Sequence, residues 1–210
     1  MSGRPARVPG AARGERRTAV LSVADKTGIV NLAAALQAQH WRIFATGGTC
    51  RLLRAEGLEA RPVAELAGDG EVLGGRVKTL DRSVFCGLLS RRDDRADTAD
   101  MAARGYRAIS LVACHPPALP RSAAWTDGID VGGPAMLRAA AKNHAGVVAL
   151  TDPGQYPDAI AALAGPDGGL GAASLAWRRD LAAAVFARLS DYDRRIAAAF
   201  AETSKGADPA

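Results

Sequence analysis

The sequence has few cysteines and no long apolar run. None of its 210 residues lie in a stretch approaching the roughly 18 consecutive apolar residues that a transmembrane helix needs, so we expect no membrane partner. The three cysteines, Cys50, Cys86 and Cys114, are odd in number and form no CxxC pair. This pattern disfavours a disulfide framework and a structural zinc site. It is typical of a reducing compartment, and we expect a cytoplasmic protein.

The positive charge is concentrated at the N-terminus. Residues 1–17 contain five arginines and one glutamate, so the rest of the chain is close to neutral although the whole carries +5. A short basic segment rich in glycine and proline is typical of a disordered extension, and it lacks the apolar stretch of a secretory signal. Weak anion or nucleic-acid contact by this tail is the alternative. We expect no nucleic-acid partner, and we interpret residues 204–210 as a second disordered tail.

Between the tails, apolar segments alternate with segments of helical periodicity. A hydrophobic content of 48% and a charged content of 23% are typical of a globular protein. Repeated βα units with continuous apolar strands predict a parallel sheet with helices on both faces. Strands are expected at residues 18–23, 41–45, 108–114 and 146–151, and helices at 29–39, 50–56, around 98–106, around 136–144 and from 175 to 201.

The stretch "ATGGT" at 45–49 lies between an expected strand and an expected helix. Glycines let the backbone approach a ligand closely, and the amides at a helix N-terminus favour negative charge. The order of strand, glycine pair and helix therefore indicates an anion site. A βα turn that needs glycine only for its geometry is the alternative.

Four further segments place polar residues beside glycines or at helix ends. Parallel α/β folds bind ligands at the carboxyl ends of their strands, and several of these segments fall there. Each also has a structural alternative, because lysines can be solvated, an aspartate can cap a helix and glycine pairs can form turns. The segments are "SVADKTG" with Lys26 and Thr27, "GGRVKTL" with Arg76 and Lys78, "IDVGGPAM" with Asp130, and "RAAAKNH" with Lys142.

Together these segments resemble the IMP cyclohydrolase domain of the bifunctional purine biosynthesis protein. The similarity runs from about Thr18 to Phe200 and is most specific in "IDVGGPAMLRAAAKNHA". It implies that residues 18–203 form an α/β domain, a three-layer parallel-sheet methylglyoxal-synthase-like fold with a C-terminal helical extension. The family's second domain, which transfers a formyl group, has no counterpart among these residues. A separate formyltransferase is therefore a possible partner.

The resemblance also implies a reaction and its residues. The reaction is dehydrative closure of a formamido-carboxamide imidazole ribonucleotide, a phosphorylated small-molecule substrate, and it needs no cofactor and no metal. Lys78, Asp130 and Lys142 are implied to supply positive charge and to move protons. The residues implied to bind substrate are Ser22, Lys26, Thr27, Thr46, Gly47, Gly48, Thr49, Arg76, Thr79, Gly132 and Gly133.

The family domain pairs, so a homodimer is expected. The long C-terminal helix supports this, since it carries more apolar residues than one face of a peripheral helix needs. The alternative is that the helix packs wholly within its own subunit. The apolar residues are Phe186, Leu189, Tyr192, Ile196 and Phe200.

The chain departs from the family pattern near the expected base site. The family segment "NLYPF" is replaced by "CHPPAL", so that His115 aligns with the asparagine and Pro117 with a site tyrosine. His115 is a candidate for the proton-transfer role, because imidazole titrates near neutrality; the alternative is that it fills a loop among prolines. Further departures are Ala45 in place of a serine, Asp81 and Arg82 in place of a histidine–proline pair, and Phe85 in place of a histidine.

Three functions follow from these observations. The first is a stand-alone cyclohydrolase that acts on the purine precursor. The second is a specialised paralogue that closes a related ring in purine-analogue or nucleoside-antibiotic biosynthesis. The third is a non-catalytic nucleotide-binding module, which the retained Lys78, Asp130 and Lys142 disfavour because a sensor does not need a reaction centre.

Overall fold

The structure is a computed structural model that describes residues 16–67, 72–120, 125–164 and 173–206. The predicted N-terminal tail lies outside these residues except for Arg16 and Arg17. The predicted C-terminal tail begins too early, because the last helix continues to Gly206. Among the residues described, no helix is both long and apolar enough to span a bilayer.

The described chain alternates strands and helices. The strands are β1 (Thr18–Val23), β2 (Arg42–Ala45), β3 (Arg61–Pro62), β4 (Ile109–His115) and β5 (Val148–Leu150). The helices are α1 (Ile29–Ala38), α2 (Gly47–Ala55), α3 (Arg82–Leu89), α4 (Arg95–Ala103), α5 (Gly132–Lys142), α6 (Tyr156–Leu163) and α7 (Leu175–Gly206). Short 3₁₀ turns occur at η1 (Val63–Glu65), η2 (Leu73–Gly75), η3 (Trp125–Gly128) and η4 (Pro153–Gln155).

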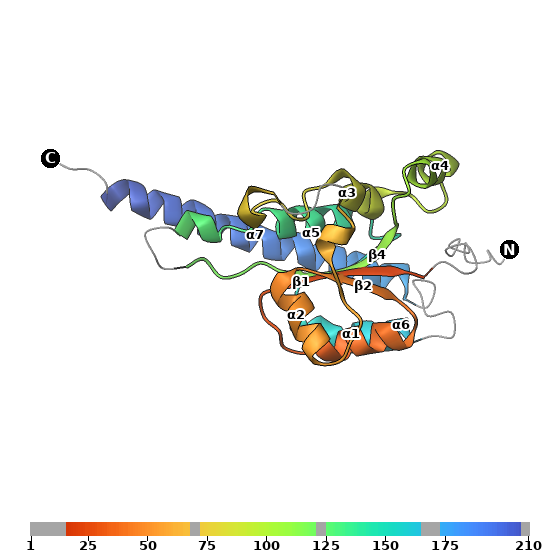
Figure 1. The fold of residues 1–210 in the computed structure, drawn as a ribbon. Coiled ribbons are helices and arrows are strands. Elements are labelled where there is room, and N and C mark those ends of the chain that lie inside the picture. The colour runs from red at the N-terminus through yellow and green to blue at the C-terminus, as the bar shows by residue number, and fades with distance from the viewer. Residues whose placement is uncertain (1–15, 68–71, 121–124, 165–172, 207–210) are drawn as a thin grey trace.

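The five strands form one parallel sheet in the order β3-β2-β1-β4-β5. Helices α1, α2 and α6 cover one face, and α3, α5 and α7 cover the other (Figure 1). Strands buried on both faces must be apolar throughout, and β1 and β4 meet this requirement because nearly all their residues are buried. The predicted three-layer α/β class with a C-terminal helical extension is confirmed.

The strand order places a binding crevice at the sheet's carboxyl edge. From β1 the chain proceeds outward to β2 and β3, and it then returns to the other side of β1 as β4 and β5. The connections after β1 and β4 therefore leave in opposite directions, and such a switch point opens a crevice between their carboxyl ends. Residues that follow these two strands are the natural site candidates.

Several element boundaries differ from the sequence-based prediction. Helix α2 begins at Gly47 and not at residue 50, so the glycine pair forms its first turn. The apolar residues 84–89 lie in helix α3, which was not predicted from the sequence and which Asp81 caps by accepting a hydrogen bond from the Ser83 amide at 2.7 Å. The short β3 and helix α6 were not predicted. Asp81, where the family has histidine, thus has a structural role.

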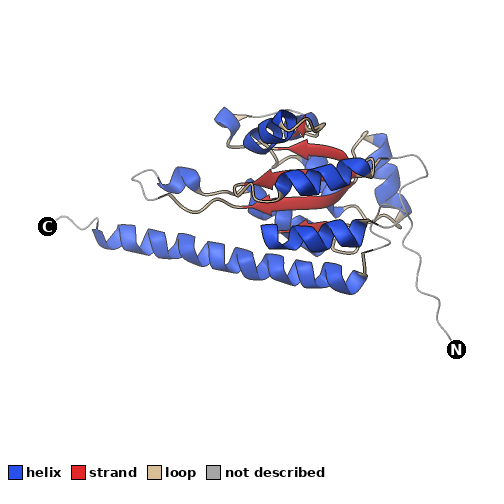
Figure 2. Ribbon diagram, turned by 90° about the horizontal axis from the view of Figure 1, so that it is seen from below, coloured by secondary structure: helices blue, strands red, loops and turns tan. Residues whose placement is uncertain are grey.

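Helix α7 is far longer than the layer it covers. Its 32 residues correspond to a length of about 48 Å. Its first half packs on α5 and β5, and its last turns extend past the body of the domain (Figure 2). Leu189 and Tyr192 are buried against the domain, whereas Phe186 and Phe200 remain about half exposed, at 50% and 49%.

Candidate functional site

The turn after β1 and the first turn of α2 lie against each other. The Thr46 hydroxyl donates to the Ser22 hydroxyl over 3.1 Å, and Lys26 Nζ donates to the Thr49 hydroxyl over 3.0 Å. Lys26 Nζ also donates to the Val23 carbonyl. Parallel pairing of β1 with β2 aligns the ends of the two strands and so produces these contacts. The structure brings together the two segments that the sequence indicated as an anion site.

The N-terminus of α2 is open and positively charged. No side chain caps it, and a Cβ built on Gly47 or Gly48 would meet only the Arg51 guanidinium, at 3.5 and 3.9 Å. Burial and the nearby Arg51 lower the pKa of Lys26. Two cations beside free helix amides repel each other, and a bound anion relieves that repulsion. Sequence reasoning missed Arg51, although its place four residues after Gly47 on a helix was the available signal.

Asp130 lies where the chain enters α5. Its Oδ1 accepts a hydrogen bond from the Gly133 amide at 2.9 Å, and its own amide donates to the Tyr192 hydroxyl of α7 at 2.8 Å. Burial raises the pKa of Asp130, and the bonds from the Gly133 and Gly132 amides partly oppose that shift. These two amides were expected to face substrate, but here they serve the Asp130 carboxylate. A carboxyl group with a raised pKa is suited to proton transfer near neutral pH.

The glycines of α5 allow two neighbours to approach its first turn. A Cβ on Gly132 would lie 2.5 Å from the Thr79 hydroxyl, and one on Gly133 would lie 2.7 Å from Cys114 Sγ. Cys114 is the register partner of Ser22 in the pairing of β1 with β4, and the Ser22 side chain partly opposes the rise in the pKa of the Cys114 thiol that burial causes. A continuous set of contacts therefore joins the anion loops to Asp130.

The loop after η2 packs on the same end of α5. Its Thr79 is buried beside Gly132, and Lys78 precedes Thr79 and is half-buried. Arg76 forms an exposed ion pair with Asp127 of η3 at 2.6 Å. Lys78 is thus placed near the Asp130 end of α5, while Arg76 in this structure is engaged with another segment of the protein.

His115 does not join this group. Its side chain stacks on Tyr156, which belongs to the core beneath α1 and α6, whereas the neighbouring Cys114 faces α5. The Tyr156 hydroxyl lies 3.1 Å from His115 Nε2, and His115 Nδ1 has no hydrogen-bond partner among the described atoms. Burial lowers the pKa of His115 to about 4, so that the imidazole is neutral at physiological pH. Sequence alone could not show which face of the sheet this residue would take.

Lys142 lies at the other end of the sheet. It is exposed in the last turn of α5, twelve residues beyond Asp130, a separation of about 18 Å along a helix. No lysine side chain bridges that distance. The structure therefore does not bring Lys142 to Asp130 within one chain.

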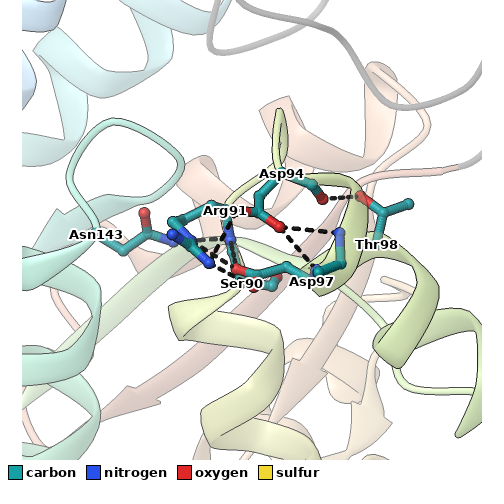
Figure 3. Close-up of polar contacts among 7 residues, drawn as sticks. Ser90, Arg91, Asp94, Asp97, Thr98 and Asn143 are labelled. Carbon is teal, nitrogen blue, oxygen red and sulfur yellow. Dashed lines mark hydrogen bonds and ion pairs between the residues drawn. The ribbon is translucent and has the colours of Figure 1, made fainter.

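The residues beside Lys142 instead form a polar cluster that fixes α4 (Figure 3). Asn143 donates to the carbonyls of Leu88 and Ser90 at 2.7 and 3.1 Å. Arg91 makes a two-pronged ion pair with Asp97, at 3.0 and 2.9 Å, which lowers the pKa of Asp97 to about 2. Residues 87–94, "GLLSRRDD", therefore form a structural motif remote from the turn after β1 and the start of α2.

The described ranges hold no group of three or more side chains suited to a metal ion. The candidate site combines an uncapped, positively charged helix N-terminus with a half-buried carboxyl group at the switch point of a parallel sheet. These features are typical of parallel α/β domains whose ligands bind at the switch point of the sheet, and the comparisons with known proteins agree with that class.

Two family models match the chain in succession. Residues 28–130 match the MGS-like domain, and residues 140–209 match the AICARFT/IMPCHase bienzyme family. The bifunctional purine biosynthesis protein PurH of Rhizobium johnstonii is 41% identical over 204 residues, and that of Mesorhizobium japonicum is 45% identical over 193. These alignments cover 94% and 89% of this chain but 37% and 35% of the relatives.

The crystal structure of ForH matches with a TM-score of 0.83 and 42% identity, covering 89% of this chain and 97% of that chain. The chain therefore belongs to the family of the IMP cyclohydrolase domain of PurH, within the methylglyoxal-synthase-like fold, as the sequence motifs predict. It spans a little over a third of the length of the curated relatives quoted above.

The neutral, buried His115 predicts a specific pH dependence of stability. Its pKa falls from 6.5 in the unfolded chain to about 4 in the folded protein, so the unfolded state binds more protons between these values. This contribution to stability is present above pH 6.5 and is lost as the pH falls toward 4. We expect the free energy of unfolding in urea to fall less steeply from pH 7 to pH 4.5 in His115→Asn than in the wild type.

The control is His40→Asn, at an exposed turn position with a φ of 61° that asparagine tolerates. Its pH profile should follow that of the wild type. The quantity compared is the slope of the free energy of unfolding against pH, and not the absolute stability of His115→Asn. Parallel profiles for the wild type and His115→Asn would show that His115 is not held neutral by burial.

Proposed function

We propose that the protein is an IMP cyclohydrolase-like enzyme that closes a pyrimidine ring by dehydration of a formamido-carboxamide imidazole ribonucleotide. One observation carries this proposal. The anion-binding turn of Lys26, Thr46 and Arg51 and the half-buried Asp130 lie at one edge of a sheet that belongs to the family fold, connected through Ser22, Cys114 and Gly133. This edge offers a place for a phosphate and, beside it, a group that transfers protons.

The ring closure needs proton transfer and charge stabilisation. The carboxamide nitrogen attacks the formyl carbon, a C–N bond forms, and the formyl oxygen takes up protons and leaves as water. In this scheme Asp130 accepts the proton of the nitrogen, since its raised pKa brings it closer to the working pH. Lys78 supplies positive charge for the developing oxyanion. The reaction forms a C–N bond and releases the formyl oxygen as water without oxidation or reduction, so the proposal includes no cofactor. A separate formyltransferase supplies the formylated substrate.

A second candidate is a paralogue that closes a related ring in purine-analogue or nucleoside-antibiotic biosynthesis. The observation that favours it is local. The phosphate loops keep the family residues except at Ala45. By contrast, Pro117 stands where the family has a site tyrosine, and His115 faces away from Asp130. A changed base site with a retained phosphate site fits a different five-membered ring. In either case we propose a cytoplasmic enzyme, which its three free thiols suit.

The anion site predicts selective stabilisation by a phosphorylated ligand. We expect a purine nucleoside monophosphate to raise the melting temperature markedly more than the free nucleoside does. Lys26→Met and Thr46→Val should remove most of that difference, because they delete a cation and a hydroxyl at the open end of α2. Differential scanning fluorimetry measures the effect.

Arg104→Met is the matched control, because it also removes one positive charge but lies exposed in an ion pair with Asp100. It should retain the full difference between nucleotide and nucleoside. Equal stabilisation of the wild type by nucleotide and nucleoside would show that these residues do not bind the phosphate group.

The chemistry predicts a graded set of kinetic effects. Lys78→Met should lower kcat by about 10²–10³, as expected for the loss of one oxyanion donor. Asp130→Asn should retain nucleotide binding while turnover collapses, since it keeps the shape but removes the base. Lys142→Met should lower kcat less than Lys78→Met does, because Lys142 lies at the far end of α5. Ring closure is followed by the absorbance of the purine product.

The substrates separate the candidate functions. Turnover of the formylated purine precursor supports the first proposal, and turnover only of analogues with another five-membered ring supports the second. Binding without closure of any of them would leave a nucleotide-binding module. If Lys142→Met lowers kcat as much as Lys78→Met does, Lys142 reaches the site from another chain.

We further propose a homodimer that uses α7. Phe186 and Phe200 are half exposed on this helix, and a hollow of about 460 Å³ beside Phe186 is lined by residues of α5 and α7. An exposed aromatic beside a hollow is typical of a contact surface. Light scattering at micromolar concentration should give the dimer mass for the wild type and a lower mass for Phe186→Glu. A monomeric wild type would refute the dimer.

A further inference from the structure

We propose that Tyr192 of α7 is a positioning residue for Asp130, and that its hydroxyl holds the backbone of Asp130 so that the carboxylate faces the substrate. This inference rests on the proposed function, because it assigns Asp130 to proton transfer. It adds a residue that contacts Asp130 but none of the other implied site residues in the described hydrogen bonds.

The contact joins two segments far apart in the chain. The Asp130 amide donates to the Tyr192 hydroxyl at 2.8 Å across 62 residues of sequence. Tyr192 is only 9% exposed and lies one turn after the buried Leu189, on the side of α7 that packs on α5. The ring is therefore held by packing, and its hydroxyl is directed at the entrance to α5.

Asp130 is held at both of its ends. Its side-chain Oδ1 accepts a hydrogen bond from the Gly133 amide at 2.9 Å. Its backbone amide donates a hydrogen bond to the Tyr192 hydroxyl. The residue lies just before the first turn of α5, and Val131 after it is 61% exposed. Without the Tyr192 hydroxyl, one side of this connection loses its anchor. A carboxylate displaced by a fraction of an ångström from a reacting atom loses much of its catalytic effect.

The electrostatic surroundings of Asp130 also indicate that its pKa depends on how firmly this turn is held. The titratable groups that face it are Cys114 from β4 and Tyr192 from α7, and both have their pKa raised in part by Asp130. Beyond Tyr192, Asp193 is paired with Arg138 of α5. No cation in these described contacts binds the Asp130 carboxylate, so its raised pKa depends on burial. Anything that loosens the turn admits water and moves that pKa toward its ordinary value.

Tyr192→Phe tests the inference, since it keeps the buried ring and removes only the hydroxyl. We expect kcat to fall about 10- to 100-fold with the KM of the nucleotide unchanged, because the phosphate loops lie on other elements. The acid limb of the kcat profile should move to lower pH, as expected if the carboxylate becomes better solvated. Tyr106→Phe, at a tyrosine near the end of α4, is the control and should behave as the wild type.

A double-mutant cycle separates positioning from general damage. In the Asp130→Asn background, Tyr192→Phe should cause no further loss of kcat, because its effect passes through the carboxylate. A loss in both backgrounds would make Tyr192 merely structural and overturn the inference. Wild-type kinetics for Tyr192→Phe would overturn it as well.

A measurement independent of turnover distinguishes the two proposals. The Asp130 carboxyl ¹³C shift, followed by NMR over pH in the ligand-free protein, should show a lower pKa in Tyr192→Phe than in the wild type. An unchanged pKa contradicts the positioning role. If the wild type closes no ring but the pKa moves as expected, the cyclohydrolase proposal fails while the control of Asp130 by Tyr192 stands.

Discussion

The site depends on how closely the start of α5 approaches the end of β4. At Gly133 a Cβ would lie 2.3 Å from Asp130 Oδ2 and 2.7 Å from Cys114 Sγ, so no larger residue fits without moving one of them. Because Gly133 has no side chain, Asp130 can turn back over the first turn of the helix and accept its amide. The same close approach buries the carboxyl group, which raises its pKa. The position of the Asp130 carboxyl group and its raised pKa thus both follow from the absence of a side chain at Gly133.

The two edges of the sheet differ in how their charged residues are paired. At the carboxyl edge, three charged groups have no ion pair in the described contacts, although Arg76 and Asp127 are paired there. These are Lys26 and Arg51 beside an uncapped helix, and the half-buried Asp130. At the amino edge, charges are paired with each other, as Arg91 with Asp97 (Figure 3). Unpaired charges cost stability, and their concentration at one edge is typical of a functional site. One sheet thus carries paired charges at its amino edge and the proposed site at its carboxyl edge.

Helix α7 links these features to assembly. It contributes the buried Leu189 and Tyr192 to the domain and leaves Phe186 and Phe200 at its surface. The helix thereby supports Asp130 and also presents half-exposed aromatic side chains that could contact a second chain. If the dimer forms through α7, association and the position of Asp130 share the same rigid element. Binding of a partner would then limit the motion of the helix that holds the catalytic turn.

The sequence by itself determined the α/β class, most of the strands and helices and the two anion-binding segments, because these follow from local patterns of apolar residues and glycines. Specific motifs also identified the family. Only the tertiary structure decided which residues meet. His115 and Cys114 are neighbours in sequence but face opposite sides of β4, since side chains alternate along a strand. Lys142 ends helix α5 whereas Asp130 lies just before its start, and Tyr192 contacts Asp130 from 62 residues away in the sequence. Contacts of this kind depend on how elements pack, and packing is not encoded in the spacing of residues along one segment.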